Sequence, residues 1–164
     1  MTAYDTKPYI ELKKEISEVI NDYISRYGFF AFSNEQLKEG IDKFKPLLGE
    51  NDKLVQFING GFMMKSKVNG FFSLNDKMQN KLRKKMQDPE FAGGAFLYEA
   101  ANHEYVINSE GDFDVVSQFG HVEFGYEKTY RDYLLEAGFD QVIIDCYRHA
   151  ICQYTREAEE KGII

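Results

Sequence analysis

The stretch LVQFINGGFMMKSKV, residues 54–68, decides the fold class that the sequence predicts. Leu54 to Ile58 alternates as a strand does, and Asn59-Gly60-Gly61 supplies the positive-φ turn that a hairpin needs before a second strand from Phe62 to Val68. A further turn signal follows at Asn69-Gly70. A small antiparallel sheet is therefore expected in this part of the chain.

Two helical patterns precede this stretch. Apolar residues recur at three- and four-residue steps from Pro8 to Tyr27, which is typical of an amphipathic helix, and Gly28 is expected to end it. Ser33 is expected to cap a second helix, with Gln36 completing a capping box. The apolar run from Phe29 to Phe32 lies between these two helices, and it is predicted to be buried.

Five helices and two short strands are predicted after the hairpin. In chain order they are a helix capped by Ser73 or Asn75 that stops near Asp88-Pro89, a helix from Glu90 to Asn102, a strand from Tyr105 to Asn108 followed by a tight turn at Ser109-Glu110-Gly111, a helical segment capped by Asp112, a strand from His121 to Phe124, and helices over Glu127–Glu136 and Val142–Lys161. Gly93-Gly94 costs its helix about 1 kcal/mol per glycine relative to Ala, so a close packing contact is expected there.

The length of 164 residues fits a single globular domain over residues 1–164. Fourteen Phe and eleven Tyr supply apolar area for one core, which argues against disorder. The predicted fold class is therefore α+β, a helix-dominated single domain with a small antiparallel sheet.

Cysteine usage and hydropathy predict a reducing compartment. Cys146 and Cys152 are six residues apart, which places them on different sides of one helix, so both are expected to be reduced, buried thiols. The chain opens without a signal peptide pattern and has no apolar run of membrane-spanning length, so we expect no membrane association and a cytoplasmic location.

The net charge of −7 disfavours general binding to phosphate backbones, which depends on Lys and Arg, and an acidic chain fits a host protein as its partner better. One basic run departs from this balance: Lys77, Lys81, Arg83, Lys84 and Lys85. Such a run is usually the solvated face of a helix. Its functional alternative is a contact with nucleic acid or a ribonucleoprotein, which would make the protein a nucleic-acid-binding accessory protein.

Six ionisable side chains lie close enough in sequence to form one site: His103, Glu104, Asp112, Asp114, His121 and Glu123. Together they could bind a divalent metal or perform general acid–base chemistry, as in a metal-assisted nuclease or hydrolase. The spacing lacks the two His four residues apart that zinc hydrolases use. No Pro-Cys-x-x-Cys follows His121-Val122-Glu123, as a deaminase signature requires.

These residues also have a structural explanation. A helix that ends at Asn102-His103 leaves carbonyl groups unsatisfied, and an Asn in the left-handed conformation or a His side chain satisfies such groups. Asp112 serves as the N-cap of Val115 to Phe119 in this interpretation. Because it covers most of the residues without a ligand, a non-catalytic protein without a cofactor is favoured, and no metal is assigned.

Two segments, FFAFSNEQL and NHEYVINSEGDFDVVSQFG, resemble a family of small uncharacterised proteins of bacterial phages and mobile elements. The matching positions are Phe29 to Gln36, Asn102 to Tyr105, Ile107-Asn108, Gly111-Asp112, Asp114 and Phe119-Gly120. Where these proteins tend to carry Trp, this chain has Phe113. The resemblance implies no established activity. Its context implies a protein that binds and inhibits a bacterial defence system, such as a CRISPR effector or a restriction enzyme.

Overall fold

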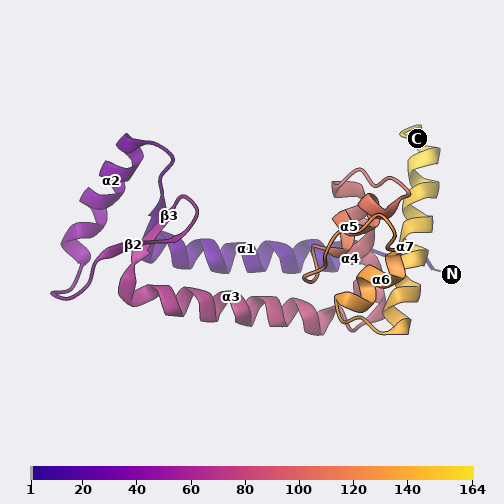
Figure 1. Cartoon of the computed structure of the whole chain (residues 1–164), viewed down its shortest axis with the longest axis horizontal. Coiled ribbons are helices and arrows are strands. Elements are labelled where there is room, and N and C mark those ends of the chain that lie inside the picture. The colour runs from indigo at the N-terminus through magenta and orange to yellow at the C-terminus, as the bar shows by residue number, and fades with distance from the viewer. Residues whose placement is uncertain (1) are drawn as a thin grey trace. The chain divides into compact units, whose positions relative to one another are not determined.

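The computed structural model describes residues 2–164 and divides the chain into two compact units (Figure 1). Unit 1 contains the residues up to Lys13 together with Lys81–Ile164, and unit 2 contains Lys14–Asn80. The prediction of a single domain over residues 1–164 stays a prediction. Within the described residues, no helix is both long and apolar enough to cross a membrane.

Helices dominate the described residues, and three strands form one small sheet (Figure 1). In chain order the elements are α1 (Lys7–Tyr27), β1 (Gly28–Phe30), α2 (Asn34–Phe44), the 3-10 helix η1 (Lys45–Leu47), β2 (Leu54–Ile58), β3 (Gly61–Met64), α3 (Lys65–Lys85), α4 (Pro89–Asn102), α5 (Ser109–Val116), α6 (Tyr130–Glu136) and α7 (Gln141–Glu160). The predicted α+β, helix-dominated fold class with a small antiparallel sheet is confirmed.

The sheet of unit 2 has the strand order β1-β3-β2, and both pairs are antiparallel. The hairpin predicted around Asn59-Gly60 is present, and Gly60 has the positive φ of 74° that its turn needs. Ile24 of α1, Met63 of β3 and Phe71 of α3 form the buried core against which partly buried side chains pack. The sheet and the two helices thus bury one another's apolar faces.

The predicted strand over residues 62–68 is wrong beyond Met64, because α3 begins at Lys65 and the expected turn at Asn69-Gly70 is helical. The cap comes from a distant residue and not from Ser73 or Asn75. Asp52 Oδ1 accepts a hydrogen bond from Ser66 N at 3.1 Å, and Asp52 Oδ2 accepts one from Ser66 Oγ at 2.6 Å. Gly70 allows Tyr23 to pack closely against α3, since a Cβ at this position would overlap the Tyr23 hydroxyl.

The run from Phe29 to Phe32 was predicted to be buried, and this is wrong. Only Phe29 points inward, where its ring stacks at 5.7 Å from that of Phe44, whereas Phe30 is 43% exposed and Phe32 is 78% exposed. The physical reason is that strand residues alternate between the two faces of a sheet. The predicted N-cap is confirmed, since Ser33 Oγ accepts a hydrogen bond from Gln36 N. The predicted capping box is wrong, because Gln36 Oε1 accepts a hydrogen bond from Phe32 N and not from Ser33 N.

Helix α4 is the centre of unit 1, and most of its residues are buried. Helix α4 packs mainly against α7 (Figure 1). The Phe96 ring of α4 lies edge-on to the Tyr147 ring of α7 at 5.1 Å. The close packing predicted at Gly93-Gly94 is confirmed. A Cβ at Gly93 would overlap the Tyr4 ring, and one at Gly94 would overlap the backbone oxygen of Asp5.

The strand predicted from Tyr105 to Asn108 is absent, and the expected tight turn after it is the first turn of α5. Asn108 is the N-cap of this helix, because its Oδ1 accepts a hydrogen bond from Gly111 N at 2.8 Å. Asp112 therefore lies inside the helix and is not its N-cap. The local sequence offers two signals, a short strand from alternating apolar residues and a short helix that begins after Asn108. The N-cap hydrogen bond of Asn108 stabilises the helix, and the apolar alternation is too short to outweigh it.

The segment from His121 to Phe124 is irregular and not a strand. Helix α6 begins after it with a complete capping box, in which Thr129 and Asp132 bond each other's backbone N–H groups. The two predicted C-terminal helices are confirmed as α6 and α7, with the first starting at Tyr130.

Candidate functional site

The six residues predicted to form one catalytic or metal site lie in separate surroundings. His103 follows the last residue of α4, and its Nε2 lies 3.2 Å from Glu99 Oε2. Glu104, and not Asn102, has the left-handed conformation, with a φ of 51°. Asp114, His121 and Glu123 are exposed. Among residues 2–164, no three His, Cys, Asp and Glu side chains are arranged to hold a metal ion.

The basic run lies in the C-terminal part of α3. Arg83, Lys84 and Lys85 occupy the last turn, where the helix dipole stabilises cations without any ligand. Met78 of α3 and Met86, which follows the helix, are buried. The favourable interaction with the helix dipole is therefore a structural reason for the basic side chains at Arg83, Lys84 and Lys85, three of the five residues of the run.

Glu99 is a buried carboxylate that sequence reasoning did not identify. Its side chain is 0% exposed within the core of unit 1. Glu99 Oε1 accepts hydrogen bonds from Lys13 Nζ at 2.6 Å and from the Tyr9 hydroxyl at 3.0 Å. The available signal was the position of Glu99 within an otherwise apolar helix, FAGGAFLYEAA, where a charge has to find partners.

The contacts of Glu99 give it a structural role. Lys13 and Tyr9 belong to the N-terminal turns of α1, so their bonds to Glu99 fix that segment against α4. Burial and the Glu99 charge together raise the pKa of the Tyr9 hydroxyl, which stays protonated as a donor. Glu99 Oε2 has no hydrogen-bond partner among the described residues, and it lies 3.2 Å from His103 Nε2.

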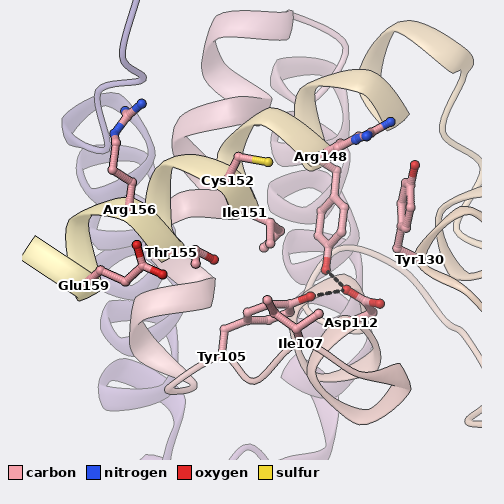
Figure 2. Close-up of a pocket in the computed structure, with 11 residues that line it drawn as sticks. Tyr105, Ile107, Asp112, Tyr130, Arg148, Ile151, Cys152, Thr155, Arg156 and Glu159 are labelled. Atoms are coloured by element: carbon pink, nitrogen blue, oxygen red, sulfur yellow. Dashed lines mark hydrogen bonds between the residues drawn. The ribbon is translucent and has the colours of Figure 1, made fainter. Parts of the chain in front are cut away.

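A pocket of about 450 Å³ lies between α7, the segment before α5, and α5 itself (Figure 2). Asp112 lines this pocket, and Figure 2 shows the Tyr105 hydroxyl directed at its carboxylate. Two hydroxyls donate to Asp112 Oδ1, Tyr105 at 2.8 Å and Tyr147 at 2.6 Å. The pocket thus holds one carboxylate that is positioned by two buried tyrosines. We call it the Asp112 pocket.

The walls of the Asp112 pocket are mainly aromatic and aliphatic. The Tyr130 ring stacks on the Tyr147 ring with centroids 5.7 Å apart and an angle of 21°. The remaining lining residues are Ile107, Arg148, Ile151, Cys152, Thr155, Arg156 and Glu159. The prediction of two buried thiols is wrong for Cys152, which is exposed, and right for Cys146, whose pKa is raised by burial.

The Asp112 carboxylate is incompletely compensated. Burial raises its pKa above the ordinary value of 3.8, although the hydrogen bonds from Tyr147 and Tyr105 act in the opposite direction. Both tyrosines in turn have raised pKa values, mainly through burial, so they remain protonated donors. Among the bonds of the described residues, none goes to Asp112 Oδ2. The hydrogen bonds that hold this carboxylate therefore all go to Oδ1.

A second candidate surface lies in unit 2. Five phenylalanine rings make successive contacts, with centroids 4.8 to 6.4 Å apart, in the order Phe32, Phe30, Phe57, Phe71 and Phe72. We call this set the aromatic row. Phe71 anchors it in the core, whereas Phe32, Phe30 and Phe72 are 78%, 43% and 45% exposed.

These features define a helix-dominated α+β protein with one carboxylate-lined pocket and one exposed aromatic surface as its candidate binding sites. The chain belongs to a family of unknown function, DUF7659, whose family model matches residues 8–145. No match to the chain was found among curated proteins or among solved structures.

Proposed function

We propose that the protein is a non-catalytic protein-binding protein that docks on its partner through the aromatic row of unit 2. The observation that carries this proposal is the exposure of Phe32, Phe30 and Phe72 within one connected set of rings. Isolated exposed apolar residues are ordinary, but contiguous ones mark interaction surfaces. Phe and Tyr are also enriched at the centres of protein interfaces.

The strands support the same proposal. Strands β1 and β2 form the two edges of the sheet, and neither contains a charged residue. Natural proteins usually protect an edge strand with charges, Pro or a bulge when no partner is to pair with it. Strand β2 has a bulge or irregularity between Gln56 and Ile58, whereas β1 has none of these three features, so β1 is the edge that is open to a partner. The aromatic row and the uncharged edge strands β1 and β2 both belong to the small sheet and to elements that contact it.

The charge of unit 2 favours a protein over a nucleic acid as the partner. Residues 14–80 contain nine basic and nine acidic side chains, so this unit has no net charge. Proteins that stack bases on aromatic rings combine the rings with a positively charged groove, because phosphates dominate the affinity. A neutral unit with exposed Phe rings lacks that electrostatic component.

For the class of partner, we propose an enzyme of a bacterial defence system, such as a CRISPR effector or a restriction enzyme. Support comes from the resemblance to small proteins of phages and mobile elements and from the acidity of unit 1. Unit 1 has eleven basic and eighteen acidic side chains, which is the whole net charge of −7. Enzymes that act on DNA have basic channels, to which an acidic protein is electrostatically complementary.

The test compares Phe32→Ala with Tyr126→Ala, which removes a similarly exposed aromatic ring of 82% exposure in unit 1. Bacteria carrying one defined defence system, CRISPR or restriction, are challenged with phage. We expect the wild-type protein and Tyr126→Ala to raise the plating efficiency, and Phe32→Ala to lose most of that effect. Thermal unfolding of the purified proteins establishes that all three are folded.

Co-purification of a tagged version with the defence enzyme from the same cells provides the binding measurement. The proposal is wrong if the wild-type protein neither raises the plating efficiency nor retains the defence enzyme in either system. The docking surface is wrong if Phe32→Ala binds as well as Tyr126→Ala does.

A further inference from the structure

We propose that the Asp112 pocket binds a small organic ammonium ion, a primary amine with a hydrocarbon body. The ammonium group would meet Asp112 Oδ2, and the hydrocarbon body would lie against the aromatic and aliphatic walls. This site is distinct from the aromatic row, which belongs to the other unit, and the proposal does not depend on a protein partner.

The first argument is the geometry of the carboxylate. Tyr105 and Tyr147 hold Asp112 Oδ1 in place with two hydrogen bonds, so the side chain is oriented before a ligand arrives. No Lys, Arg or His within the described residues forms an ion pair with Asp112. In this half-buried carboxylate, one oxygen accepts two hydrogen bonds from the protein and the other accepts none. Such a group is suited to a ligand that donates hydrogen bonds and carries positive charge.

The second argument is the aromatic wall. The partly exposed Tyr130 ring stacks on the Tyr147 ring, whereas Tyr147 and Tyr105 are 1% and 7% exposed and contribute mainly their hydroxyl groups. The faces of aromatic rings attract cations, and pockets for ammonium ligands commonly combine such rings with a carboxylate. The volume of about 450 Å³ accommodates a ligand of this size with room for its hydrocarbon portion.

The third argument is electrostatic, and it decides between a cation and an anion. The four charged residues of the lining balance, because Arg148 and Arg156 oppose Asp112 and Glu159. Arg148, Arg156 and Glu159 are exposed, so water screens their charges, whereas Asp112 is partly buried. The electrostatic field of unit 1 therefore favours a cationic ligand over an anionic one, since the net charge of this unit is −7.

The experiment uses three probes of nearly the same shape: 2-phenylethylamine, 2-phenylethanol and 3-phenylpropanoate. Their binding to the full chain at pH 7 is measured by titration calorimetry and by protein NMR. Protection of Cys152 from a thiol reagent reports occupancy of this pocket, since Cys152 lines it and the other cysteine is buried. We expect the amine to bind at least about tenfold more tightly than the alcohol, and the carboxylate to bind most weakly.

The matched variants are Asp112→Asn and Asp114→Asn, which change the net charge equally. The side-chain amide introduced by Asp112→Asn would keep an oxygen for the two tyrosine hydroxyls, so the variant is expected to fold, and far-ultraviolet circular dichroism checks this. Asp114 is exposed on the same helix and does not line the pocket. We expect Asp112→Asn to remove the preference for the amine over the alcohol and Asp114→Asn to keep it.

Five outcomes would overturn the proposal. Equal binding of amine and alcohol would show a pocket for uncharged hydrocarbon, and tighter binding of the carboxylate would show that the arginines determine the ligand. Amine binding that leaves Cys152 unprotected, or that survives Asp112→Asn unchanged, would place the cation elsewhere. Absence of binding by all three probes at millimolar concentration would also exclude this ligand class.

Discussion

Glu99 and Asp112 place two carboxylates among the buried aromatic residues of unit 1, and each is held by a different set of partners. Glu99 is bonded by Lys13 and Tyr9, so its charge is matched by a cation. Asp112 is bonded by two neutral tyrosine hydroxyls and retains an uncompensated charge. This contrast assigns Glu99 to structure and Asp112 to binding, because Glu99 is fully buried whereas Asp112 lines a pocket that a ligand can enter.

The Lys13–Glu99 ion pair should contribute more to the free energy of unfolding than the exposed ion pairs do, because its Glu99 carboxylate is fully buried. We expect Lys13→Met to lower the free energy of unfolding by about 1–3 kcal/mol, because it leaves the buried Glu99 carboxylate without its cation. Lys14→Met is the control, since Lys14 pairs with Glu18 at 3.9 Å on the exposed side of α1. Urea unfolding measures both. Equal losses in the two variants would contradict the assignment.

Asp112 should make the stability depend on pH in the direction opposite to an ordinary paired carboxylate. Its raised pKa means that the native state binds the proton more tightly than the unfolded chain, so this group's stabilising contribution is present below pH 3.8 and is lost as the pH rises through the folded-state pKa. We therefore expect Asp112→Asn to unfold at a higher temperature than the wild type at pH 7. The difference should shrink toward pH 3.8, and a less stable variant at pH 7 would refute this.

At the scale of elements, α3 and α5 show how a cap decides where a helix begins. Asn108 caps α5 from the adjacent position, whereas Asp52 caps α3 from fourteen residues away in sequence. Distant capping converts residues 65–72, which contain a turn signal, into the first two turns of a long helix. Tertiary contacts thereby override a local preference for a turn.

Loss of the Asp52 cap should destabilise unit 2. The hydrogen bonds from Ser66 lower the pKa of Asp52 below 3.8, so its contribution to stability is present above that value and is lost as the pH falls through the folded-state pKa. We expect Asp52→Ala to lower the urea midpoint at pH 7 and to converge with the wild type in acid. Asp76→Ala, an exposed change within α3, should leave the midpoint unchanged or slightly raised. An equal midpoint for Asp52→Ala and the wild type would contradict the capping role.

At the scale of the whole molecule, the charge is divided between the two units. Unit 2 is neutral and carries the aromatic row, whereas unit 1 carries the full net charge and the Asp112 pocket. The proposed protein-binding surface and the proposed amine site therefore belong to different parts of the chain. Separate variants, Phe32→Ala and Asp112→Asn, can test them independently.

The sequence by itself determined the elements whose signals are local. The three-residue and four-residue apolar steps of α1, the Asn59-Gly60 turn, the Ser33 cap and the Gly93-Gly94 packing site depend on neighbouring residues, and each was predicted correctly. The α+β class follows from these elements. Such features are readable because helix and strand periods, turn conformations and caps are set by short-range sterics and hydrogen bonds.

Only the tertiary structure decided which polar residues meet. Asp112 was predicted as an N-cap or a metal ligand, but the fold brings it to Tyr105 and Tyr147, the latter 35 residues away. Glu99 is bonded by Tyr9 and Lys13 across 90 and 86 residues. The reason is that these bonds join different elements, α1 with α4 and α5 with α7, whose packing and burial in the folded chain no spacing along the sequence encodes.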